Sequence, residues 1–120
     1  MWEIRFYRSA KGGCPVKKYL ESLPVKTQVK INNLLELLEE MGHELKRPYA
    51  DYLDQGIREL RVIFSGNQYR VLHFFFMKNY IICTHSFTKK TNKVPPEEIE
   101  RALRIKKDFE TRYARGEYKL

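Results

Sequence analysis

The sequence has only two cysteines among its 120 residues, Cys14 and Cys83, and they stand far apart with no Cys-x-x-Cys spacing. A disulfide framework needs more cysteines, and a cysteine-based zinc site needs closely spaced pairs. The shortage therefore argues against both. It predicts two small, buried thiol side chains in a protein of the reducing cytoplasm.

Long hydrophobic runs are also missing. The most apolar stretch, VLHFFFMKNYIICTHSF, is interrupted by His73, Lys78, Asn79 and His85, so it does not read as a membrane span. The N-terminal segment MWEIRFYRS has charges where a signal peptide needs an apolar core. The sequence thus predicts neither export nor a membrane anchor, and we expect a cytoplasmic location.

Acidic residues are few relative to basic ones. Asp and Glu number 15 against 23 Lys and Arg, which gives a formal charge of +8 and an isoelectric point near 9.5. This balance favours an anionic partner, most often nucleic acid, although basic domains also bind acidic proteins. No repeat, linker or low-complexity segment divides the chain, so we expect one domain over residues 1–120.

The first half of the chain predicts one strand and two helices. The alternating, aromatic-rich segment WEIRFY is typical of a strand. Pro15 suits the start of a short helix that runs to about residue 23, before Pro24. Apolar residues then recur at helical spacing from about residue 26 to residue 41, and Gly42 is a stop signal. The polar segment HELKRPYADYLDQG that follows is predicted to be a loop.

The second half predicts three strands and a last helix. Strand-like segments at about 57–64, 68–77 and 80–87 are separated only by short turns, so they should form an antiparallel meander. Pro95 and Pro96 open the last helix, with acidic residues at its start. The order β-α-α-β-β-β-α indicates an α+β fold, with helices stacked on one face of a small twisted sheet.

Two arginines interrupt strands that are otherwise largely apolar. In a structural interpretation, Arg61 and Arg70 pair with carboxylates such as Glu59 and cover apolar surface with their stems. In a functional interpretation, both arginines point into one concavity of the meander, close to Lys89 and Lys90 at a strand end. Converging cations repel one another unless a polyanion lies between them. Phosphate is the obvious candidate, because it suits both the Arg fork and the Lys ammonium.

Several segments together resemble a known family. GIRELRV, YRV and HSFTKKTNKVPPEEIERA, in this order and spacing, are similar to the signature of RelE/HigB-type toxins of bacterial toxin–antitoxin systems. The nearest resemblance is to the phage-derived, HigB-like branch, whose early P-V-x-x-Y-L-x-S-L-P helix is also present. The resemblance implies a RelE/ParE-like fold with the two N-terminal helices on one face of the sheet.

The same resemblance implies an activity and partners. It implies a ribosome-dependent endoribonuclease that cuts translated messenger RNA without a metal or other cofactor. In such a reaction the ribose 2′-OH attacks the adjacent phosphate and leaves a 2′,3′-cyclic end. The implied partners are ribosome-bound message, ribosomal RNA and a helix-turn-helix, HigA-like antitoxin.

The resemblance also implies roles for individual residues. Arg61, Arg70 and Lys90 match positions that bind the phosphate and its transition state, and Lys89 and Lys93 match positions that hold neighbouring RNA backbone. The chain departs from some relatives in having no tyrosine or histidine after the KK pair, where an acid/base residue can stand. Electrostatic stabilisation would then supply most of the catalysis.

Two further residues are candidates for the site. His85 is the nearest titratable substitute for the absent acid/base residue, and an ordinary imidazole pKa suits proton transfer. Strand parity places His85 on one face with Cys83 and Phe87, so a buried core histidine is an equally good interpretation. Arg58, in the GIRELRV segment, is a further candidate for substrate binding.

Two other functions remain open from the sequence. ParE-like relatives of these toxins poison DNA gyrase by binding it, and they lack much of the basic cleft. A plain nucleic-acid-binding module is suggested by charge alone, but the chain has no helix-turn-helix, zinc-finger or RNP-type motif.

Overall fold

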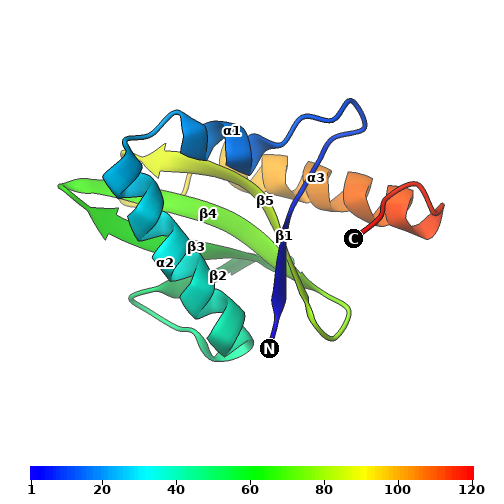
Figure 1. The fold of residues 1–120 in the computed structure, drawn as a ribbon, viewed down its shortest axis with the longest axis horizontal. Coiled ribbons are helices and arrows are strands. Elements are labelled where there is room, and N and C mark those ends of the chain that lie inside the picture. The colour runs from blue at the N-terminus through cyan, green and yellow to red at the C-terminus, as the bar shows by residue number, and fades with distance from the viewer.

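A computed structural model describes residues 1–120 and contains one five-stranded sheet with three α-helices (Figure 1). The strand order is β1-β5-β4-β3-β2, with β1 parallel to β5 and all other neighbours antiparallel. The elements are β1 (Glu3–Phe6), α1 (Pro15–Glu21), α2 (Val25–Met41), the short 3-10 helix η1 (Gly42–Glu44), β2 (Ala50–Asp54), β3 (Ile57–Phe64), β4 (Asn67–Phe76), β5 (Tyr80–Lys89) and α3 (Pro96–Ala114). The predicted α+β fold with a mostly antiparallel sheet is confirmed.

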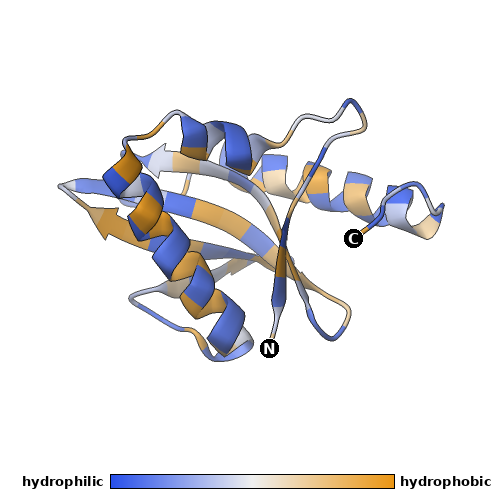
Figure 2. Cartoon of the chain, in the orientation of Figure 1, coloured by the Kyte–Doolittle hydropathy of each residue, from blue (hydrophilic) through white to orange (hydrophobic).

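Helices α1 and α2 cover one face of the sheet. Leu34 and Leu38 of α2 pack with Val62 and Val71 of the sheet in a core of 14 buried residues. These helix residues recur at the spacing that the sequence predicted, and Figure 2 shows hydrophobic and hydrophilic residues interleaved along α2. The predicted packing of the two N-terminal helices on one face is therefore confirmed.

Helix α2 ends where the chain passes very close to another residue. Gly42 caps the helix with a φ of 53°, and a Cβ atom added to it would lie 2.0 Å from Nε1 of Trp2. Any other residue would clash there and would also be strained at this positive φ. Gly42 thus lets the end of α2 pack against the start of β1.

Helix α3 covers the opposite face of the sheet. Ala102 and Phe109 of α3 pack with Ile57, Leu72 and Ile82 in a second core. The expectation that helices stack on one face holds for α1 and α2 but not for α3.

None of the helices combines the length and the hydrophobicity that a membrane-spanning helix requires.

The segment predicted to be a polar loop contains strand β2. Ala50 pairs with Leu60 of β3, and of the five β2 residues only Ala50 is buried. β2 is an edge strand with one neighbour, so most of its side chains remain in solvent. This polarity made the strand look like a loop.

A β-bulge in β5 changes which side chains share a face. Leu72 pairs with His85 but His73 pairs with Cys83, so Thr84 is an extra residue on β5. Cys83 belongs to the core under α1 and α2, whereas His85 bonds to a residue of α3. The predicted placement of His85 on one face with Cys83 is therefore wrong, because the bulge interrupts the alternation.

Candidate functional site

Arg61 and Arg70 lie directly opposite each other on β3 and β4, as the meander predicted. One carboxylate, Glu59, lies between them: Nε of Arg70 donates to Glu59 Oε1 at 2.7 Å, and a terminal nitrogen of Arg61 donates to Oε2 at 3.1 Å. The Glu59 and Arg70 side chains are 3% and 0% exposed, while that of Arg61 is 18% exposed. The structural interpretation, in which both arginines pair with Glu59, is confirmed.

All three guanidinium nitrogens of Arg70 donate hydrogen bonds. Its two terminal nitrogens donate to the Tyr69 carbonyl at 3.1 Å and to Gln68 Oε1 at 3.0 Å. Burial lowers the pKa of the Arg70 guanidinium, and the adjacent Glu59 carboxylate opposes that shift. Arginine stays protonated in proteins, so this is a buried, fully paired cation. It lies beneath the surface and does not face solvent.

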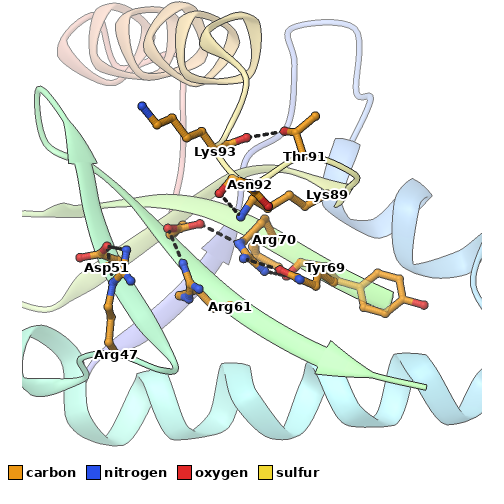
Figure 3. Close-up of polar contacts among 12 residues, drawn as sticks. Arg47, Asp51, Arg61, Tyr69, Arg70, Lys89, Thr91, Asn92 and Lys93 are labelled. Atoms are coloured by element: carbon orange, nitrogen blue, oxygen red, sulfur yellow. Dashed lines mark hydrogen bonds and ion pairs between the residues drawn. The ribbon is translucent and has the colours of Figure 1, made fainter. Parts of the chain in front are cut away.

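Above this arginine pair is a cleft of about 230 Å³, which we call the basic cleft. It lies where β3, the end of β5 and the following loop meet, and Figure 3 shows its charged side chains together. The charged residues that line it are the cations Arg47, Arg61, Lys89 and Lys93 and the carboxylates Asp51 and Glu59. The four cations outnumber the two carboxylates, so the basic cleft has positive charge in excess.

The carboxylates of the basic cleft are already paired. Arg47 contacts Asp51 with two nitrogens, each at 2.8 Å, and Glu59 serves the two strand arginines. Nε of Arg61 is buried and has no hydrogen-bond partner. A buried donor without a partner is costly and therefore favours a ligand that accepts its hydrogen bond.

Lys89 lines the basic cleft from the end of β5. It pairs in register with Gln68, and its Nζ donates to the Asn92 carbonyl at 2.8 Å. Burial lowers the pKa of Lys89, and the positive charges of Arg70 and Arg61 lower it further, against the attraction of Glu59. A lysine with a lowered pKa can exchange a proton more readily at neutral pH.

The neighbouring lysines differ in position. Lys93 lines the basic cleft with an exposed side chain, and its carbonyl accepts a hydrogen bond from Thr91 at 2.6 Å. Lys90 follows the last residue of β5, is exposed and does not line the cleft. The structure therefore brings Lys89 and Lys93 together with Arg61 but leaves Lys90 outside.

Two other candidates lie away from the basic cleft. Arg58 is on the opposite face of β3, with its guanidinium carbon 5.7 Å from the centre of the Phe75 ring. Its position corrects the expectation that it contacts the same ligand as Arg61, because residues three apart on a strand point to opposite faces.

His85 is fully buried beside α3. Its Nε2 lies 3.0 Å from Glu98 Oε1 and its Nδ1 lies 3.1 Å from Thr84 Oγ1. Burial lowers the pKa of His85, and the hydrogen bond that its Nε2 donates to the Glu98 carboxylate opposes this shift. His85 does not line the basic cleft, so the structure supports the core interpretation of this residue.

Sequence reasoning missed Arg47 and Asp51 as members of the site. Both lie in or beside the segment predicted to be a loop, and they reach the cleft because β2 pairs with β3. Their i,i+4 spacing with opposite charges was a weak signal. No group of three or more His, Cys, Asp or Glu side chains is arranged to hold a metal ion.

Comparison with known proteins gives one family. Residues 18–107 match the family model described as phage-derived protein Gp49-like (DUF891). The matched region includes α2, the whole of β2 to β5 and the start of α3, so it contains every residue of the basic cleft. No curated protein matches the chain.

Proposed function

The chain belongs to the phage-derived Gp49-like family, a RelE-like family compatible with a toxin-like role, and we propose that it is the toxin of a toxin–antitoxin pair. In this proposal it is an endoribonuclease that cuts messenger RNA on the ribosome. The basic cleft is the observation that supports it: Arg47, Arg61, Lys89 and Lys93 line a space with excess positive charge. A phosphodiester supplies the missing negative charge.

The proposed reaction is a transfer of the phosphate from the 5′ oxygen to the ribose 2′ oxygen. The 2′ hydroxyl gives its proton to a water molecule as its oxygen attacks phosphorus, the bond from phosphorus to the 5′ oxygen breaks, and the 5′ oxygen takes up a proton from Lys89. The products are a 2′,3′-cyclic phosphate and a 5′-hydroxyl. Charge that develops on the phosphorane must be stabilised, and this is the role we assign to Arg61.

Lys89 is the group that we assign to proton transfer. Its lowered pKa and its place inside the basic cleft fit an acid that protonates the leaving 5′ oxygen. This assignment replaces Lys90, which lies outside the cleft. Arg70 and Glu59 act as positioning residues, because both are buried and hold Arg61 in place.

A matched pair of variants on β3 tests the arginine assignment. Arg61→Gln should slow single-turnover cleavage of ribosome-bound message by about 10²–10³-fold, the usual effect of removing one transition-state donor. Arg58→Gln makes the same charge change on the opposite face of the same strand and should leave the rate within about threefold of wild type. Equal loss in both variants would show that general charge, rather than the basic cleft, matters.

A second matched pair separates adjacent lysines. Lys89→Gln should slow the chemical step at saturating ribosome by about 10²-fold or more, whereas Lys90→Gln should not. The readout is single-turnover cleavage, with bound message measured separately. If Lys90→Gln is the slower variant, the proton-transfer assignment is wrong.

The partners are part of the proposal. A helix-turn-helix antitoxin should suppress toxicity when it is expressed with this chain, and toxicity should disappear in Arg61→Gln. New message ends and gyrase-linked DNA breaks should be scored in the same cells. DNA breaks without cuts in translated messages would overturn the endoribonuclease in favour of a gyrase poison.

A further inference from the structure

A second polar hollow of about 290 Å³ lies beside β5, between α1 and α3, and we call it the α1–α3 hollow. The parallel strand β1 pairs with β5 only as far as Cys83, so the later part of β5 has helix α1 beside it instead of a strand. The hollow is lined by Pro15, Lys18, Tyr19, Ser22, Ser86 and Arg101. None of these residues lines the basic cleft.

The hollow has positive charge and no carboxylate. Pro15, Lys18 and Tyr19 of α1 and the C-cap residue Ser22 are spaced i, i+3, i+4 and i+7, so one face of that helix forms the wall. Lys18 comes from this wall and Arg101 comes from α3. Neither cation takes part in an ion pair within the chain. In the basic cleft, by contrast, Asp51 and Glu59 already neutralise part of the positive charge.

Ser86 lines the same hollow with an unpartnered donor. The residue is only 7% exposed, and its Oγ is buried without any hydrogen-bond partner. The hydroxyl of Ser22 is already used, because it donates to the Tyr19 carbonyl at 2.6 Å. A buried hydroxyl that makes no hydrogen bond is costly, so such a group favours a ligand that accepts its hydrogen bond.

The hollow continues along α3. A neighbouring hollow of about 360 Å³ shares Pro15 and Arg101 with it and adds Arg104. The carboxylate of this second hollow, Asp108, is already bonded to Tyr7 at 2.5 Å and to Arg112 at 2.9 Å. The two hollows together therefore present three cations with little competing negative charge in reach, an arrangement that suits an extended anion.

We infer that the α1–α3 hollow is a phosphate-binding site, in which Ser86 donates a hydrogen bond to a phosphate oxygen and Lys18 and Arg101 balance its charge. The same chemistry is offered by a phosphodiester of a nucleic-acid backbone and by free inorganic phosphate. The inference does not depend on the endoribonuclease proposal, since none of these residues takes part in the proposed reaction. It would give the chain an anion contact on the other side of β5 from the basic cleft.

Two binding measurements distinguish the sources of phosphate. A fluorescent single-stranded DNA oligonucleotide has phosphodiesters but no 2′-OH, so it cannot undergo the proposed reaction. Lys18→Gln and Arg101→Gln should each weaken its binding by roughly threefold to tenfold and reduce the slope of log affinity against log salt by about one at most. Titration with inorganic phosphate, followed by the backbone amide resonances of Ser86 and its neighbours, tests the free ion.

Matched variants control for the loss of charge. Lys17→Gln and Lys107→Gln remove one positive charge each from exposed positions on the same two helices that do not line either hollow. They should reduce oligonucleotide binding less than Lys18→Gln and Arg101→Gln do. Equal effects in all four variants, together with no phosphate-induced shift at Ser86, would overturn the site. Phosphate shifts at Ser86 without any difference in oligonucleotide binding would assign the site to the free ion.

Ser86→Ala should affect stability without anion and phosphate binding in opposite directions. The change removes a buried hydroxyl without a partner, so the melting temperature without anion should rise or stay the same. The same change should weaken phosphate binding and reduce the rise in melting temperature that phosphate produces. If Ser86→Ala keeps the full response to phosphate, the hydroxyl does not bind the anion and the inference is wrong.

Discussion

The two faces of the sheet are buried in different ways. On the face under α1 and α2, 14 buried residues form a continuous apolar core, whereas the core under α3 has eight. Phe74 and Ile82 pack under α3, but Glu59, Arg61 and Arg70 lie on the same face beyond that apolar core. The basic cleft thus lies where the helix cover of the second face ends.

Each face of the sheet also contains a buried basic side chain, Arg70 on one face and His73 on the other, and the two differ in their partners. Arg70 is fully buried and has a carboxylate at 2.7 Å. His73, on the α1 and α2 face, is equally buried, but its only hydrogen-bond partner is the Val71 carbonyl at 3.2 Å. Burial lowers the pKa of His73 to about 4, so this ring is neutral at pH 7. Arg70, which has the Glu59 carboxylate beside it, is therefore a buried cation, whereas His73, which has no carboxylate partner, is buried in its neutral form.

Loss of the Glu59 carboxylate should have the largest effect on stability. Glu59→Gln leaves Arg70 as a buried cation without a charged partner, so the free energy of unfolding should fall by about 3–5 kcal/mol. Urea denaturation monitored by tryptophan fluorescence measures the change. Asp51→Asn, in the more exposed pair with Arg47, is the matched control and should cost about 1 kcal/mol or less.

A double variant sharpens the same prediction. Replacement of Glu59 and Arg70 together by methionine removes the fully buried charge and leaves only the partly exposed Arg61 without its carboxylate, so it should be less destabilising than Glu59→Gln alone. If the double variant is the less stable of the two, the ion pair itself contributes more than the penalty of a lone buried charge. In that case, the penalty of an unpaired buried charge would not explain why Arg70 is buried as a cation and His73 as a neutral ring.

The pH dependence of stability should come next in size. The folded-state pKa of His73, about 4, lies below the ordinary value of 6.5, so the unfolded chain binds more protons between these values. Stability should therefore fall as the pH decreases from 6.5 to 4, by up to about 3 kcal/mol from this residue. His73→Leu should therefore flatten that slope.

The contribution of His85 to the pH dependence of stability must be distinguished from that of His73. Burial also lowers the pKa of His85, although Glu98 opposes the shift, so His85 contributes with the same sign. Unfolding measured at several pH values for His73→Leu, His85→Gln and the double variant assigns the two contributions. An unchanged slope in His73→Leu would show that this ring is not held neutral in the folded state.

The sequence predicted the fold well where elements have strong apolar patterns. Helix α2 and the three strands of the meander have bounds within two residues of those predicted, because each buries a complete apolar face. Strand β2 was missed because only Ala50 is buried in it. The face of α3 could not be predicted, since periodicity indicates an apolar side but does not say which face of the sheet it covers.

The site was predicted in part for a similar reason. Alternation on β3 and β4 placed Arg61 and Arg70 together, and the register confirms it. It could not show that Glu59 lies close enough to serve both, nor that Lys89 rather than Lys90 enters the cleft. His85 was misplaced because one extra residue, Thr84, reverses the alternation. Bulges of this kind leave no clear signal in a single sequence.

The smallest expected effect concerns the exposed edge of the basic cleft. Lys93 lines the cleft from the loop after β5, and its exposed side chain forms no ion pair. In the proposed function it holds RNA backbone that enters the cleft and does not take part in the chemical step. Lys93→Gln should therefore weaken binding to ribosome-bound message by roughly threefold to tenfold and lower the salt slope by about one at most.

Lys78→Gln is the control for Lys93, because Lys78 is an exposed lysine in the turn between β4 and β5, at the other end of β5 from the cleft. Cleavage at saturating ribosome should stay at the wild-type rate in Lys93→Gln, since the cations that face the reacting phosphate remain in place. A slower chemical step would place Lys93 inside the reaction. Equal weakening by both variants would mean that affinity follows net charge alone, and that the uncovered part of the second face has no special part in binding.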